Sequence, residues 1–233
     1  MKYVKPRKQS GKGRYFWNSL NKPIDKFKNS CYLSIDRSVE MKGMLSKREM
    51  VLGVATKLFA AKGFDGASVR KIAEEAGLSV AGMFHYFSTK EEILFDIMMV
   101  FLDEGLRGLK RICESEKPSI ERLKEVCKFF SEYFAGHQDE LTILSNEGKS
   151  LFPEHKQIFK RKQRQYLDIV RSLLRELHEE GLLKEIDQTV LAFLFFGMVL
   201  WTSRWYNPQG IVNPTELGEI ISEVFLRGVL KGG

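Results

Sequence analysis

The side chains whose types and spacing point most directly to a chemical role follow Ser79. Small residues, Val80 to Gly82, come first, and His85 and Tyr86 follow as groups that can reach a phosphate. The hydroxyl of Ser79 can cap a short helix that begins at the next residue. A short helix of this kind suits insertion, N-terminus first, into the major groove of DNA.

The neighbouring residues predict the helices that would position this stretch. Ser68 is placed to cap a helix that Gly77 ends with a positive φ angle, and a tight turn then leads to the second helix. Residues 46–63 before them have an amphipathic pattern, and Ser88 or Thr89 begins a further helix. Together these signals predict a helix-turn-helix. Two short capped helices also occur in many all-α proteins with other roles.

The stretch from residue 46 to residue 95 resembles, without a gap, the TetR family of one-component bacterial transcription regulators. Its caps, helix ends, core anchors and spacings all agree with the family pattern. The resemblance implies an all-α fold, with an N-terminal three-helix helix-turn-helix DNA-binding domain and a larger C-terminal helical domain for ligand binding and dimerisation. The segments that carry it are Arg48-Glu49, 58–64, Ser68-Val69, Ile72-Ala73, 76–79, 84–87 and 90–94.

The chain departs from the family pattern in its second short helix. Where the family usually has Gly-Thr followed by Leu-Tyr, this chain has Ala81-Gly82-Met83-Phe84, so two hydroxyl groups that commonly contact DNA are absent. The resemblance implies that the partner is double-stranded DNA with a palindromic operator. The residues expected to lie at the DNA are Lys47, Ser68, Val69, Arg70, Ser79, Val80, Ala81, Gly82, Phe84, His85, Tyr86 and Lys90.

The positive charge of the chain is concentrated near its N-terminal end. Of the net charge of +7, residues 1–45 contribute +8 (11 Lys and Arg, 3 Asp and Glu), and the remaining 26 basic and 27 acidic residues contribute −1. We divide the chain into a basic leader (1–43), a DNA-binding domain (44–92) and a ligand-binding and dimerisation domain (93–233). The leader is interpreted as disordered, or as an extension upstream of the true start. The alternative is a basic arm that adds nonspecific DNA affinity.

No pattern in the sequence indicates catalysis or a metal site. Cys31, Cys113 and Cys127 are odd in number and lack CxxC spacing, which favours a reducing compartment and argues against disulfides or zinc. The longest apolar run, 190–201, is too short for a membrane span, and the N-terminal end lacks the apolar core of a secretory signal. We therefore expect a cytoplasmic protein with no membrane partner, no catalytic residues, no metal and no cofactor.

Residues 187–206 are expected to form a helix that is apolar almost all round. Such a helix must be covered on both sides, by the core of the chain and by a second subunit. The amphipathic helix expected over 213–230 can join it in a four-helix interface across a two-fold axis, and Gly197 and Gly218 allow helices to approach closely. The TetR resemblance likewise implies a homodimer.

Trp201 and Trp205 lie four residues apart, beside Arg204 and before a Pro-Gly turn. Two core tryptophans at a helix end would give the same pattern. The string Trp-Tyr-x-Pro-x-Gly at 205–210 resembles the C-terminal domains of TetR regulators of fatty-acid and sterol catabolism, which respond to acyl-CoA thioesters. Such an effector needs an apolar tunnel with cationic groups at its mouth. The residues expected to contact it are Phe130, Phe134, Phe152, Phe195, Met198, Trp201, Arg204 and Trp205.

The leading hypothesis is a repressor that a fatty acyl-CoA, or a similar small hydrophobic effector, releases from its operator. Basic residues at 156–164 would serve the CoA group or simply face solvent. The second hypothesis is a multidrug or aromatic-compound sensor of the same fold, for which the CoA group would not matter. The third is a helical enzyme or scaffold with a vestigial helix-turn-helix, for which the sequence offers no nucleophile–base pair.

Overall fold

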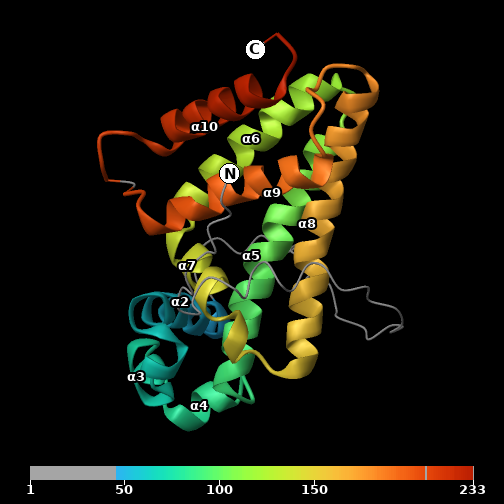
Figure 1. Cartoon of the computed structure of the whole chain (residues 1–233). Helices are drawn as coiled ribbons and strands as arrows, with labels where there is room; N and C mark the ends of the chain where they lie inside the picture. Colours follow the sequence, from blue (N-terminus) through green and yellow to red (C-terminus); the bar gives the residue numbers. More distant parts are fainter. Residues whose placement is uncertain (1–45, 208, 233) are drawn as a thin grey trace, which may run out of the picture. The chain divides into compact units, whose positions relative to one another are not determined.

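The computed structural model describes residues 46–207 and 209–232. The expectations for the leader, residues 1–43, lie outside these residues. Within the described residues the secondary structure is helical, apart from one isolated β-bridge between Leu183 and Leu230. The expectation of an all-α fold is confirmed, with the helix-turn-helix preceding a larger helical part (Figure 1).

The N-terminal helices are α2 (Lys47–Gly66), α3 (Val69–Glu75) and α4 (Val80–Phe84). Gly63 interrupts α2 with a φ of 73°, which explains why the sequence pattern predicted an end there. α5 (Lys90–Cys113) then leads away from them, and Thr89 caps it by accepting a hydrogen bond from Glu92 N–H. α3 and α4 have only seven and five residues, and helices this short are marginal on their own. Packing against a shared core therefore stabilises them.

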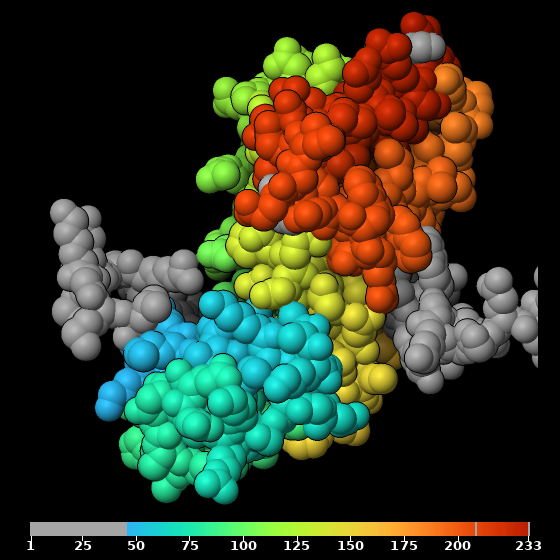
Figure 2. Space-filling view, turned by 90° about the vertical axis from the view of Figure 1, so that its left-hand side faces the viewer, coloured from blue at the N-terminus to red at the C-terminus, as the bar shows by residue number. Residues whose placement is uncertain are grey.

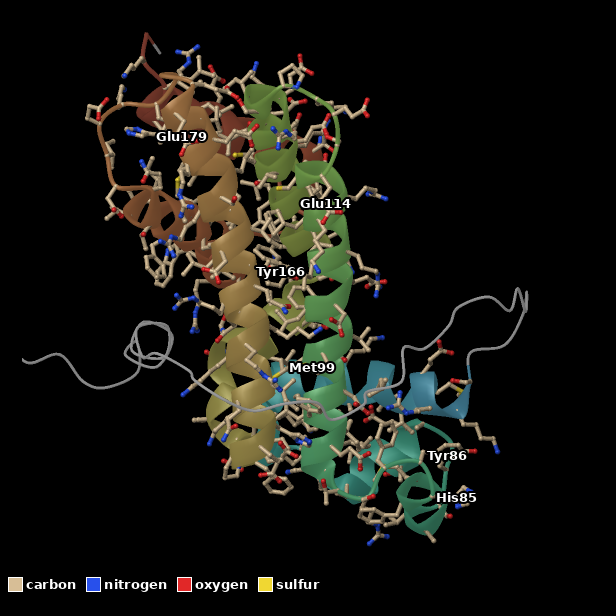
Figure 3. The ribbon with its side chains drawn as sticks, turned by 90° about the vertical axis from the view of Figure 1, so that its right-hand side faces the viewer. His85, Tyr86, Met99, Glu114, Tyr166 and Glu179 are labelled. Carbon is tan, nitrogen blue, oxygen red and sulfur yellow. The ribbon has the colours of Figure 1, made fainter. Side chains whose placement is uncertain are left out.

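The larger part begins with α6 (Ser119–Gly136), α7 (Gln138–Asn146) and a 3-10 turn, η1 (Gly148–Ser150). The long helix α8 (Pro153–Glu179) runs beside α5 in the same direction, as Figures 1 and 3 both show. α10 (Pro214–Val229) packs along α6, and α9 (Gln188–Trp201) packs against α8, α6 and α10. α7 packs on α2, so the larger part also contacts the N-terminal helices directly.

The helix expected over 187–206 is shorter in the structure. α9 ends at Trp201 and gives way to a 3-10 turn, η2 (Thr202–Arg204). The hydroxyls of Thr202 and Ser203 donate to the carbonyls of Val199 and Leu200, at 2.7 and 2.9 Å. Such side-chain bonds compete with the backbone hydrogen bonds of the helix, and the prediction from sequence did not take them into account.

Candidate nucleic-acid interface and effector domain

The helix-turn-helix is built by two serine caps and one glycine turn. Ser68 Oγ accepts the Lys71 N–H at 3.2 Å, and Ser79 Oγ accepts the Gly82 N–H at 3.0 Å. Between the two short helices, Gly77 has a φ of 67°. Each cap satisfies a backbone donor at the start of a helix, so the two serines fix where α3 and α4 begin.

One face of α4 is buried and the other is exposed. Met83 is fully buried beneath it, and Phe87 anchors the following turn in the core. Ala81 and His85 are exposed, and Tyr86 is exposed next to His85, as Figure 3 shows at the lower end of the structure. The remaining expected contact residues on α4 are Val80 and Phe84, both exposed, and Gly82, which is half-buried.

The expected contact residues on α2 and α3 divide into exposed and packed side chains. Lys47, Ser68 and Arg70 are exposed, so each can reach a neighbouring phosphate. Val69 is half-buried and packs against the core. Its expected contact with DNA therefore depends on its exposed edge alone.

Lys90 was expected at a DNA phosphate, but the structure gives it internal partners. Its ammonium donates to the carbonyl oxygens of Phe64 and Ala67, at 2.7 and 3.0 Å, and lies 4.2 Å from the centre of the Phe64 ring. Lys90 thereby holds the end of α2 against the start of α5. Its contact with DNA stays a proposal, and its replacement would also loosen this junction.

A buried carboxylate joins α5 to α8. Glu91 is only 4% exposed, and its carboxylate accepts the Phe152 N–H at 2.8 Å and lies 2.9 Å from His155 Nδ1. The His155 ring stacks on Phe95 with the ring centres 3.8 Å apart. A buried carboxylate is stable when donors surround it, and here the donors come from the first turns of α8.

A second polar link joins α2 to α5. The Arg48 guanidinium pairs with Asp96 and lies 5.0 Å from the centre of the ring of Phe87, in the segment between α4 and α5. Burial raises the pKa of Asp96, and the charge of Arg48 opposes that rise. The sequence analysis did not single out Glu91, Asp96 or His155. Acidic residues are common in the first turns of a helix, and nothing near them in the sequence indicates that they pair with residues of another helix.

Two tyrosines bond to the middle of α5. Tyr133 Oη from α6 donates to the Phe101 carbonyl at 2.8 Å, and Tyr166 Oη from α8 donates to the Leu102 carbonyl at 2.5 Å. Figure 3 shows Tyr166 between α8 and α5. A Cβ at Gly105 would overlap the Tyr166 hydroxyl, so only glycine admits this approach. Burial raises the pKa of both tyrosines, and each stays a neutral donor.

The structure brings some of the expected effector residues together. Phe130, Phe134 and Phe195 are buried in one aromatic cluster between α6 and α9, with the Phe130 ring 5.4 Å from Phe134 and 5.8 Å from Phe195. Met198 is half-buried and packs against the same core. These four residues therefore remain compatible with one apolar site.

The other expected effector residues lie elsewhere. Phe152 stands at the start of α8, beside Glu91, so its grouping with the aromatic cluster needs correction. Trp201 and Trp205 are 65% and 59% exposed, and they do not share one helix face, because α9 ends at Trp201. Arg204 donates to Asn146 Oδ1 of α7 at 2.7 Å. The tryptophans thus lie on the surface and not among the buried rings.

The basic residues of α8 have mixed surroundings. Lys162 pairs with Asp103 of α5, and Arg164 with Asp168 one turn further along α8. Lys160 and Arg161 are exposed. Within 46–207 and 209–232, no group of three or more His, Cys, Asp or Glu side chains is arranged to hold a metal ion. In the same residues, no helix is long and apolar enough to cross a membrane.

Comparison with known families agrees with this architecture. The family described as "Bacterial regulatory proteins, tetR family" matches residues 51–97, and the family "Tetracyclin repressor-like, C-terminal domain" matches residues 116–229. The chain belongs to the TetR family. Members of this family are transcription regulators that bind DNA and are not enzymes, so the expectation of a DNA-binding regulator without enzymatic activity is confirmed.

Individual relatives extend the match over most of the chain. The "HTH-type transcriptional repressor KstR2" of Mycobacterium tuberculosis H37Rv is 26% identical over 194 residues, covering 81% of this chain and 95% of the relative. The structure of "AibR in complex with isovaleryl coenzyme A and operator DNA" is 26% identical with a TM-score of 0.71, covering 77% of this chain and 97% of that one. The structure of KstR2, with 24% identity and a TM-score of 0.76, shares the fold.

Proposed function

We propose that this TetR-family regulator is a repressor that binds a palindromic operator as a homodimer and leaves it when an acyl-CoA binds. The observation that carries the proposal is an exposed apolar face on the last two helices, in a chain whose helix-turn-helix can read only one half-site. A second copy that covers this face would supply the second recognition helix.

The apolar face runs along one side of α9 and α10. Figure 2 shows the two helices as a continuous part of one side of the structure. On α9 the stripe passes Gly197, around which a Cβ would meet no atom within 4 Å, so this surface is open. Large exposed apolar surface on a soluble protein often marks a site where another protein binds. The exposed side chains are Val190, Leu194 and Trp201 on α9, and Ile220 and Val224 on α10.

The two glycines expected at the interface have different surroundings. Gly218 faces α6 of its own chain, where a Cβ would lie 3.5 Å from the Lys128 carbonyl oxygen, so it serves the packing of α10 on α6. Gly197 faces open space. We therefore assign only Gly197 to the proposed contact between subunits.

The dimer is tested by placing a charge in the stripe. Leu194→Glu puts a carboxylate at a position that is 56% exposed in the single chain and buried in the proposed dimer. We expect light scattering to report a monomer that no longer binds a palindromic duplex. Leu182→Glu, at an exposed leucine outside the stripe, is the matched control and should remain dimeric. A dimeric Leu194→Glu variant would contradict the assignment.

The acyl-CoA part of the proposal rests on AibR, whose structure holds isovaleryl coenzyme A, and on the aromatic cluster of this chain. The rings of Phe130, Phe134 and Phe195 pack on one another, so an acyl chain entering there must part α6 from α9. We place the acyl chain in this cluster with Met198, and the CoA group towards Arg204 and Trp205. An effector releases DNA only if it binds the DNA-free conformation more tightly.

An aromatic-compound sensor is the second candidate, because the same cluster offers stacking partners without any requirement for CoA. Fluorescence anisotropy on labelled operator distinguishes the two. We expect acyl-CoAs to release DNA, with free acids and CoA alone far less active. Phe195→Leu should change the preferred chain length, whereas Phe59→Leu, an equally buried phenylalanine of α2, should not. Release by aromatic compounds but by no acyl-CoA would favour the sensor.

A further inference from the structure

The exposed face of α4 is apolar where it would enter a groove. Val80 and Phe84 lie four residues apart, on one helix face, and are 38% and 43% exposed. Ala81, between them, is also exposed. Together these side chains form a small apolar patch, and grouped apolar side chains can mark a surface that a partner covers.

Two polar groups near this face, the hydroxyl of Ser79 and the ammonium of Lys71, have partners within the chain. Ser79 Oγ accepts the Gly82 N–H, and a Cβ at position 82 would lie only 3.1 Å from that oxygen. Lys71 of α3 pairs with Glu74 and Glu75, and these carboxylates, Glu74 first, raise its pKa. The exposed face of α4 therefore presents the methyl groups of Val80 and Ala81 and the phenyl group of Phe84. It lacks the amide and guanidinium groups that read bases by paired hydrogen bonds.

The chemistry of the major groove identifies what such a face can distinguish. Thymine presents a C5-methyl group there, and alanine and phenylalanine side chains contact it favourably. We propose that α4 selects its half-site through thymine methyl groups, which Val80, Ala81 and Phe84 contact. Exposed Arg70 and Lys47 supply phosphate contacts that carry affinity without sequence preference. This inference rests on the proposed binding of operator DNA by α4.

The expected effect follows from the area of one methyl group. Burying a group of that size is worth about fourfold in affinity. Removing one contacted methyl from each half-site should therefore weaken a dimer by about sixteenfold, if the two half-sites contribute independently. A phosphate contact gives no such dependence on the base.

The experiment begins with a duplex that the full chain itself selects from a random library. Versions of this duplex with deoxyuridine in place of single thymidines lack only the methyl group. We expect one or more thymidines per half-site whose replacement weakens binding about fourfold. Uracil duplexes that all bind within twofold of the parent would overturn the inference. A selection that returns no preferred sequence would instead count against the proposed function.

Variants assign the methyl groups to side chains. In Val80→Ala or Phe84→Ala, the uracil penalty at one position should disappear, because the partner of that methyl is gone. Arg70→Ala is the matched control: it should reduce the salt dependence of binding and keep the full penalty. Full penalties in both α4 variants would overturn the assignment. The uracil comparison on the unmodified chain decides the inference even if a variant fails to fold.

Discussion

Glu91 offers the sharpest test of how α5 is fixed to α8. Its buried carboxylate accepts the Phe152 N–H and contacts His155 Nδ1, so Glu91→Ala removes the acceptor and leaves two donors without partners. Hydrogen bonds to a charged group are worth about 1.5–3 kcal/mol each, and breaking a buried pair costs about 3–5 kcal/mol. We expect Glu91→Ala to lower the free energy of unfolding by about 3–5 kcal/mol. Glu91→Gln, which keeps one acceptor oxygen, should cost about 1–3 kcal/mol.

The assay is urea unfolding at one fixed protein concentration, because a dimer gains stability with concentration. Glu154→Ala is the matched control, since Glu154 is an exposed acid in the first turn of α8. Its removal should cost about 0.3–1 kcal/mol. Hydrogen exchange gives a second readout: the Phe152 amide should lose protection in Glu91→Ala only. Equal stability of Glu91→Ala and Glu154→Ala would refute the reasoning.

Further outcomes follow from single residues. Gly105→Ala should destabilise the chain by about 1–3 kcal/mol in urea, and Tyr166→Phe in the same chain should restore part of this by removing the hydroxyl that the Cβ overlaps. Ser79→Ala should cost about 1 kcal/mol in the same assay and weaken operator binding, because α4 loses its cap. Burial raises the pKa of Cys113 to about 11 and of Cys127 to about 12, so iodoacetamide at pH 8 should modify both in urea but neither in the folded chain. Stability should accordingly fall above pH 9, where the unfolded thiols ionise first.

The helix-turn-helix could be predicted because its determinants are local. Ser68 and Ser79 cap the helices that follow them within three residues, and Gly77 provides the positive φ that the turn needs. Helix periodicity also predicted the amphipathic helices that became α2 and α10, because an apolar face repeats along one segment. Signals of this kind need no knowledge of the rest of the chain.

The polar junctions could not be predicted, because their partners are distant in sequence. Glu91 meets His155, 64 residues away, and Lys90 meets Phe64, 26 residues away. A lysine after the recognition helix looks like a phosphate ligand in sequence, and its partners appear only once α2 and α5 are packed. The end of α9 at Trp201 was not predicted either. Thr202 and Ser203 donate to carbonyls of the preceding turn there, and such hydroxyl bonds leave only a weak signal in the sequence.

The packing also shows where an effector would act if it binds as proposed. Phe130 and Phe134 of α6 belong to the aromatic cluster, and Tyr133 between them bonds to α5. Parting α6 from α9 therefore also displaces the donor that holds the middle of α5. The first turns of α5 are bonded in turn to α2 and α8, through Asp96 and Glu91. A shift of α5 is thus transmitted to the helix-turn-helix through buried or half-buried bonds. Solvent competes less with such bonds than with exposed ones.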